Sequence, residues 1–298
     1  MKRALGPRRH IGAQRGFSIL ELMVAMLLGL LMLAAVFLSS AGMVVASRQQ
    51  RAASLMADDA LLALSLMRRD LLMAGYIHPV SINGDQFAAD NNSIPSRPVY
   101  GCLYGFNSNL APVAQGTCDS SSKRADAIEI NFEASKASVD LSDSTQLTGC
   151  QGATLKDAQG LGPTVAADAT TRVPSSHRYF LNDSKHLACA TAYNAAQPLV
   201  PNVEALRITY GVSSSWQVDQ ANTRRAVRYV DAASVNSWND VVAVHLCVLM
   251  RSDEPVLDKN ETATLGYVDC DGASQTSTDN LLRRAFATTV ALRNRVAP

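Results

Sequence analysis

An uncharged stretch of 26 residues, 22–47, limits what this chain can fold into more than any other feature. A helix needs about 20 apolar residues to cross a bilayer, so the stretch can span one with residues to spare. It is too long for a secretory signal, whose apolar core has roughly 7–15 residues. Residues 1–16 contain five Lys and Arg side chains and no Asp or Glu, which places the N-terminus in the cytoplasm by the positive-inside rule. The sequence therefore predicts a single membrane helix with the remaining chain on the outer side.

One carboxylate, Glu21, stands at the start of this stretch, within the segment Arg-Gly-Phe-Ser-Ile-Leu-Glu at residues 15–21. A charge in a membrane segment is costly and usually has a function and a partner. An ordinary signal anchor explains the length of the apolar stretch. It does not explain a lone acid placed directly after Gly16-Phe17-Ser18 and two aliphatic residues.

Residues 15–21 resemble the class III signal of type IV prepilins and of type II secretion pseudopilins. In that family a membrane-bound prepilin peptidase cuts after the glycine, here Gly16. The same enzyme methylates the new terminal amine, here on Phe17. The glutamate at this place, Glu21, helps to dock each subunit into a helical filament, where a neighbouring subunit's amine neutralises it. Ile19-Leu20 only reorders the aliphatic pair that the family usually has.

A long helix is predicted from Phe17 to Ala74, because this range contains no proline and only two glycines. After Arg48 apolar residues recur at helical spacing, so the second half of this helix of about 58 residues should pack on a globular domain. Gly75 is a suitable stop. One apolar series is Leu55, Leu62, Leu66 and Met73, and beside it lie Met56, Ala60, Leu64, Met67 and Leu71.

Two further segments narrow the resemblance. Residues 69–76, Arg-Asp-Leu-Leu-Met-Ala-Gly-Tyr, and residues 283–294 resemble PilW-type minor pilins and the related J-type pseudopilins. The resemblance implies a pilin-like α+β fold, with the long helix packed on an antiparallel sheet and long loops tethered by disulfides. It divides the chain into a cleaved leader (1–16), a transmembrane and filament-core helix (17–47), an amphipathic helix (48–76) and a β-rich domain (77–298).

Alternating polar and apolar residues predict strands in the last part of the chain. The predicted strands are residues 127–133, 177–181, 203–212, 226–230, 242–250 and 285–293. Between them lie polar stretches rich in Ser, Asn, Thr, Ala and Gly, at 81–125, 134–175 and 252–280. These stretches are expected to be loops.

The six cysteines, Cys102, Cys118, Cys150, Cys189, Cys247 and Cys270, all follow the membrane stretch. An even number in an exported domain favours disulfides, for which fifteen pairings are possible. Sequential pairing is favoured because each bond then closes a modest polar loop. A metal site is the alternative, but there is no Cys-x-x-Cys, and His186 and Cys189 make only a lone pair of ligands. No metal or cofactor is expected.

Charge and motifs exclude other classes of function. Without residues 1–16 the chain has 22 basic and 26 acidic side chains, which argues against a nucleic-acid partner. The histidines are scattered, and no nucleophile elbow or phosphate-binding glycine loop is present, so no enzyme activity is expected. Trp216 and Trp238 are either core residues or exposed contacts to a receptor.

The resemblance implies a minor pilin that primes or caps type IV pilus assembly at the tip and supports twitching motility and adhesion. Its partners would be the prepilin peptidase, the other minor pilins, the major pilin and a tip adhesin. The chain would sit in the inner membrane before assembly and at the cell surface afterwards. The alternatives are a J-type minor pseudopilin of the type II secretion piston and a tip-located ligand-binding pilin.

Overall fold

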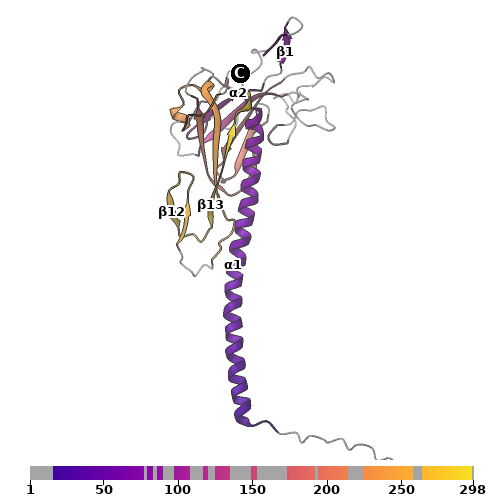
Figure 1. Cartoon of the computed structure of the whole chain (residues 1–298), viewed down its shortest axis with the longest axis vertical. Coiled ribbons are helices and arrows are strands. Elements are labelled where there is room, and N and C mark those ends of the chain that lie inside the picture. Colours follow the sequence, from indigo (N-terminus) through magenta and orange to yellow (C-terminus); the bar gives the residue numbers. More distant parts are fainter. Residues whose placement is uncertain are drawn as a thin grey trace, which may run out of the picture. The chain divides into compact units, whose positions relative to one another are not determined.

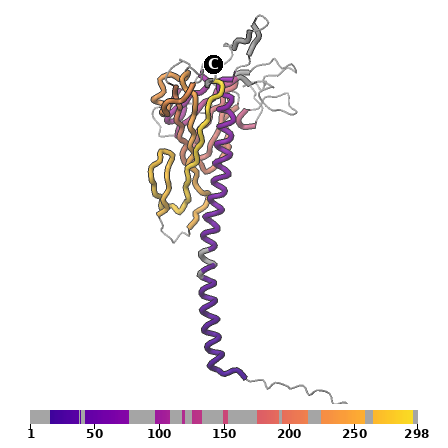
Figure 2. Tube along the Cα trace, in the orientation of Figure 1, coloured from indigo at the N-terminus to yellow at the C-terminus, as the bar shows by residue number. Residues whose placement is uncertain are grey.

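The computed structural model describes residues 16–76, 79–82, 86–89, 97–107, 117–119, 125–134, 149–152, 173–191, 194–213, 224–257 and 264–296. The chain divides into two compact units, residues 1–48 and 49–298. Helix α1, Ile19–Met73, contributes its first part to one unit and its second part to the other (Figure 1). Figure 2 follows the same course along the Cα trace.

In the first unit α1 presents apolar side chains all round. Phe17, Leu20, Leu31 and Phe37 are each 60–80% exposed, and so are most of their apolar neighbours. A helix that is apolar on every side is typical of a membrane span or of the centre of a larger assembly.

In the second unit one face of α1 is buried. The buried apolar side chains are Met56, Ala60, Ala63, Leu64, Met67 and Leu71, and Asp70 is buried beside them. The other apolar series, which begins at Leu55, was also expected to pack on the domain. This prediction is partly wrong, because Leu55 and Leu62 are 55% and 48% exposed. The two series have almost the same spacing and differ by one residue, about 100° of rotation, so periodicity alone cannot choose between them. The sheets cover only one of the two stripes.

Two antiparallel sheets pack with this face of α1 into one core that both sheets share (Figure 1). The first has the order β3-β4-β5-β6-β7 and the second the order β13-β10-β8-β9. The first comprises β3 (Val99–Cys102), β4 (Ala127–Ala134), β5 (Val173–Leu181), β6 (Leu187–Thr191) and β7 (Gln197–Val200). The second comprises β8 (Val203–Val212), β9 (Arg228–Val230), β10 (Val241–Arg251) and β13 (Arg283–Ala291).

Two hairpins and three short helices complete the described structure. The hairpins pair β1 (Pro79–Ile82) with β2 (Gln86–Ala89) and β11 (Leu265–Val268) with β12 (Ser274–Ser277). Two 3₁₀ turns, η1 (Ala232–Ser234) and η2 (Trp238–Asp240), connect β9 to β10, and α2 (Arg293–Val296) follows β13.

The α+β architecture, with the helix packed on antiparallel strands, agrees with the sequence-based expectation. Strand β8 has the predicted bounds, and β4, β5, β9, β10 and β13 overlap the other predicted ranges. The polar stretches are not loops throughout, because β2 and β3 lie within 81–125 and β11 and β12 within 252–280. These strands have only four residues each, too few to show an alternating pattern.

Candidate functional site

The N-terminal segment of the first unit is the first candidate site. Gly16, Phe17 and Ser18 precede α1, and the Leu22 amide donates to the Ser18 carbonyl at 3.1 Å. Glu21 lies in the first turn of α1, where the helix dipole favours a negative charge. Phe17 is 80% exposed, and no described residue forms an ion pair with Glu21. Both side chains are therefore available to groups outside this chain.

Residues Ile19–Phe37 are long and apolar enough to cross a membrane. This segment of 19 residues has a mean hydropathy of 2.6, and none of it is buried within the structure. Among the described residues it is the one helix with that length and composition. Its exposed apolar surface needs lipid or other helices around it.

In the second unit Asp70 connects α1 to the five-stranded sheet through side-chain contacts with β5. Its Oδ2 accepts a hydrogen bond from the Tyr179 hydroxyl at 2.5 Å and lies 2.7 Å from His177 Nδ1. All three residues are 3% exposed or less. Burial alone disfavours a charged Asp70, but His177 and Tyr179 together more than offset that cost, so the pKa of Asp70 is lowered.

The same cluster has the connectivity of a hydrolase triad. His177 Nε2 lies 3.2 Å from Ser175 Oγ, which gives a chain from serine through histidine to aspartate. Ser175 is 1% exposed, so its hydroxyl has no access to a substrate. The cluster is therefore a buried polar contact that positions helix against sheet, and it is not a catalytic centre.

The C-terminal end of α1 brings together the two segments that the sequence singled out. Asn294 Nδ2 donates to the carbonyls of Met73 and Ala74, at 3.4 and 3.1 Å. Gly75, with φ of 72°, takes the left-handed conformation expected of a helix stop, and its amide donates to the Asn131 carbonyl at 2.8 Å. The end of the chain thus caps the end of the long helix.

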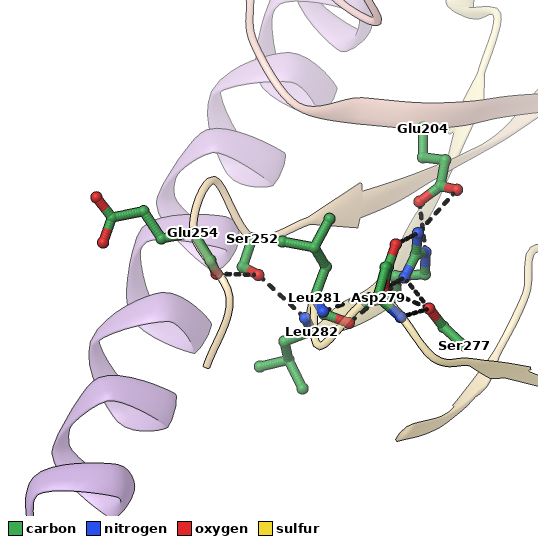
Figure 3. Close-up of polar contacts among 8 residues, drawn as sticks. Glu204, Ser252, Glu254, Ser277, Asp279, Leu281 and Leu282 are labelled. Carbon is green, nitrogen blue, oxygen red and sulfur yellow. Dashed lines mark hydrogen bonds and ion pairs between the residues drawn. The ribbon is translucent and has the colours of Figure 1, made fainter. Parts of the chain in front are cut away.

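Arg283, at the start of β13, is the centre of a second polar cluster. Figure 3 labels its partners Glu204, Ser277 and Asp279. Its Nε donates to Glu204 on β8 at 2.6 Å, and its Nη2 donates to Asp279 at 2.7 Å. The hydrogen bond from Arg283 holds the pKa of Asp279 well below its usual value. Beside it the Ser252 hydroxyl accepts from the Leu282 amide at 3.0 Å (Figure 3). The guanidinium thus fixes the connection between β12 and β13 to the four-stranded sheet.

Three disulfides tie polar segments to the sheets. They join Cys102 with Cys118, Cys150 with Cys189 and Cys247 with Cys270, which is the sequential pairing. The last bond holds the turn of the β11–β12 hairpin to β10, whereas the second holds residues 149–152 to β6. Over the residues that the structure describes, no three His, Cys, Asp or Glu side chains come together as metal ligands.

Asp126, just before β4, links the two sheets. Its Oδ2 accepts from the Ile208 amide of β8 at 2.8 Å and lies 3.4 Å from Arg207 Nη1. Burial raises the pKa of Asp126 to about 6, although the Ile208 amide and Arg207 oppose the rise. The folded protein therefore holds this proton at a pH where the unfolded chain has released it.

We expect Asp126→Asn to remove a pH dependence from stability. Because the pKa of Asp126 is higher in the folded protein, proton binding to Asp126 stabilises the fold. This stabilisation is complete below the unfolded pKa near 4 and is lost as the pH rises through the folded pKa of about 6. The two values differ by about two units, or about 3 kcal/mol. Between pH 4.5 and 7.5 the unfolding free energy of the wild type should therefore fall by more than that of the Asp126→Asn variant. Asp253→Asn, which changes an exposed carboxylate outside this contact, is the control and should keep the wild-type profile.

Some of these site residues were predicted from the sequence and others were not. The structure places Gly16, Phe17 and Glu21 together at the start of α1, as their spacing requires. It also brings His177 to Asp70, a pairing that the sequence did not reveal, because 107 residues separate them. Arg283 and Asn294 were singled out only as parts of a motif, and nothing in the sequence pointed to their contacts. Trp216 and His78 lie outside the described residues.

Comparisons with known proteins address both ends of the chain. Residues 171–294 match the family described as type IV pilus-assembly protein W, PilW, and residues 11–37 match the prokaryotic N-terminal methylation motif. No curated protein matches the chain. Among solved structures, a type IV-like pilin from Thermus thermophilus is similar at 14% identity, over 81% of this chain and 98% of its own, with a TM-score of 0.38.

The PilW match covers β5 with His177 and Tyr179, the Arg283 cluster and the cap at Asn294. The methylation motif covers Gly16, Phe17, Glu21 and the apolar half of α1. Over residues 171–294 the chain is therefore similar to the PilW family of type IV pilus-assembly proteins, and it carries the N-terminal methylation motif at the start of an apolar helix.

Proposed function

We propose that the chain is inserted in the inner membrane with its N-terminus in the cytoplasm. Prepilin peptidase then cuts it between Gly16 and Phe17, and the Phe17 amine is methylated. Gly16 supports this assignment, because it precedes α1 in exposed chain and nothing lies within 4 Å of where its Cβ would be. A Cβ there would lie more than 4 Å from any other described part of the protein. It would meet the peptidase.

The mature subunit then joins other minor pilins and the major pilin, with Glu21 as its assembly contact. We infer that it helps to prime or cap the pilus at the tip, next to a tip adhesin, and so supports twitching motility and attachment. One observation carries the proposal. A helix that is apolar on all sides, with a carboxylate in its first turn, leads into a folded unit that is similar to the PilW family.

Gly16→Phe is expected to block processing and leave the precursor in the inner membrane. The bulky side chain would occupy the cleavage site without disturbing the fold, because the surroundings of Gly16 are open. N-terminal sequencing and intact mass would show a chain that still carries residues 1–16, which the mature wild type lacks. Gly29→Ala, also in open surroundings within α1, is the matched control and should be cleaved normally. Normal cleavage of the Gly16→Phe variant would contradict the proposal.

A J-type minor pseudopilin of type II secretion would share this processing and this helix. The PilW match favours the pilus. Deletion of the gene separates the two functions, because loss of surface pili and twitching supports the pilus role. Loss of protein secretion with normal piliation would instead assign the chain to the secretion piston.

A further inference from the structure

An open cleft in the second unit lies between the edge strand β3 and the turns that connect β9 to β10. Its volume is about 370 Å³, at the small end of the range of ligand sites. It is lined by Arg97, Tyr100, Asn236, Ser237, Trp238 and Asn239. The lining thus combines one cation and two aromatic rings with amide and hydroxyl groups, and it contains no carboxylate.

Several hydrogen-bond donors in this cleft are uncommitted. The Arg97 guanidinium lies 4.8 Å from the centre of the Tyr100 ring, and no described carboxylate pairs with it. The Ser237 side chain makes no capping hydrogen bond to η2, although it occupies the cap position. The indole N–H of Trp238 likewise donates to no group in the described part of the chain. These donors face a space that a ligand with acceptors could fill.

Residues beneath the cleft hold Trp238 and the backbone of Arg97 in place. The Trp238 ring meets Tyr100 and Tyr210 edge to face, with centroid distances of 5.0 and 4.9 Å. Tyr210 is 1% exposed, and a Cβ on Gly101 would overlap its hydroxyl, so the stack leaves no room for rearrangement. The Arg97 carbonyl accepts from buried Asn131 Nδ2 at 2.9 Å, which anchors the backbone beneath the guanidinium. A pre-positioned set of donors reduces the entropy cost of binding.

We propose that this cleft binds an acidic sugar residue, such as a uronic acid unit of a polysaccharide. The sugar carboxylate would pair with Arg97, since a guanidinium matches carboxylate geometry and no acid in the cleft competes. The ring hydroxyls would accept from the Asn236 amide, the Ser237 hydroxyl and the Trp238 indole, and the apolar face of the ring would contact the aromatic wall. The nearest acid on η2, Asp240, lies 3.5 Å from Arg224, which offsets its charge. The site is separate from α1 and does not depend on the assembly role.

The test measures binding of methyl β-D-glucuronide to the full chain in detergent, by saturation-transfer difference NMR titration. Methyl β-D-glucoside, which has a hydroxymethyl group in place of the carboxylate, and inorganic phosphate are the comparison probes. We expect saturable glucuronide binding and about tenfold weaker glucoside binding, because a hydrogen bond to a charged group contributes about 1.5–3 kcal/mol. Arg97→Gln should weaken glucuronide binding by about tenfold.

Arg284→Gln is the matched control, because Arg284 also lies over an aromatic ring, Phe286, but away from the cleft. It should bind as the wild type does. Trp238→Phe keeps a ring but removes the indole donor, and should weaken both sugars several-fold, which tests the site even if the Arg97→Gln variant does not fold. Equal binding of the two sugars, unchanged binding by the Arg97→Gln variant, or full displacement by equimolar phosphate would each overturn the proposal.

Discussion

Glu21→Ala should leave cleavage and methylation intact but remove the subunit from assembled pili. The carboxylate lies in the first turn of α1, four residues from the amine that cleavage would create on Phe17. In the proposed filament a neighbour's amine neutralises it among apolar helices. Losing one partner of such a buried pair costs about 3–5 kcal/mol, or more than about a hundredfold in the equilibrium for incorporation. Immunoblots of sheared pili and of membranes would measure the distribution.

Two further variants make this result specific. Glu21→Gln keeps the shape of the side chain without its charge, and it should fail in the same way. Met32→Leu changes an exposed apolar residue of the same helix and should be incorporated normally. If the Glu21→Ala variant reached pili at the wild-type level, the pairing of Glu21 with a neighbouring amine would be wrong.

The long helix and the central strands could be predicted because their sequence patterns are long. Strand β8 alternates buried and partly exposed residues along much of its ten positions and is bounded as predicted. Strand β6, Leu187–Thr191, was missed because all five of its residues are buried and it shows no alternation. A strand covered on both faces resembles any short run of small and apolar residues.

The contacts that hold the second unit together were beyond sequence reasoning for a different reason. Asp70 and Arg283 were recognisable only as parts of family-like segments, whereas their partners His177 and Glu204 lie 107 and 79 residues away. Local patterns carry no information about such distances. Cysteines are the exception, because the number of possible partners is small and each bond must close a loop.

Asp70→Ala is expected to destabilise the second unit strongly. The substitution leaves His177 Nδ1 and the Tyr179 hydroxyl without their acceptor in a site that is at most 3% exposed. Buried polar groups that lose a charged partner cost about 3–5 kcal/mol, a large part of the roughly 5–15 kcal/mol that stabilises a typical domain. Urea unfolding of the full chain in detergent, followed by circular dichroism, would measure the loss. Asp58→Ala, on an exposed position of the same helix, should change stability by less than about 0.5 kcal/mol.

A double-mutant cycle with Tyr179→Phe separates the hydrogen bond from general damage to the core. The hydroxyl donates to Asp70, so the two changes together should cost less than the sum of their separate effects.

The pH dependence of stability gives an independent check. Folding lowers the pKa of Asp70, so the ionised carboxylate stabilises the folded protein. This stabilisation is complete above the unfolded pKa near 4 and is lost as the pH falls through the lower folded pKa. Wild-type stability should therefore fall towards that of the Asp70→Ala variant under acid conditions. Strictly additive effects and a constant difference across pH would show that Asp70 does not act through this contact.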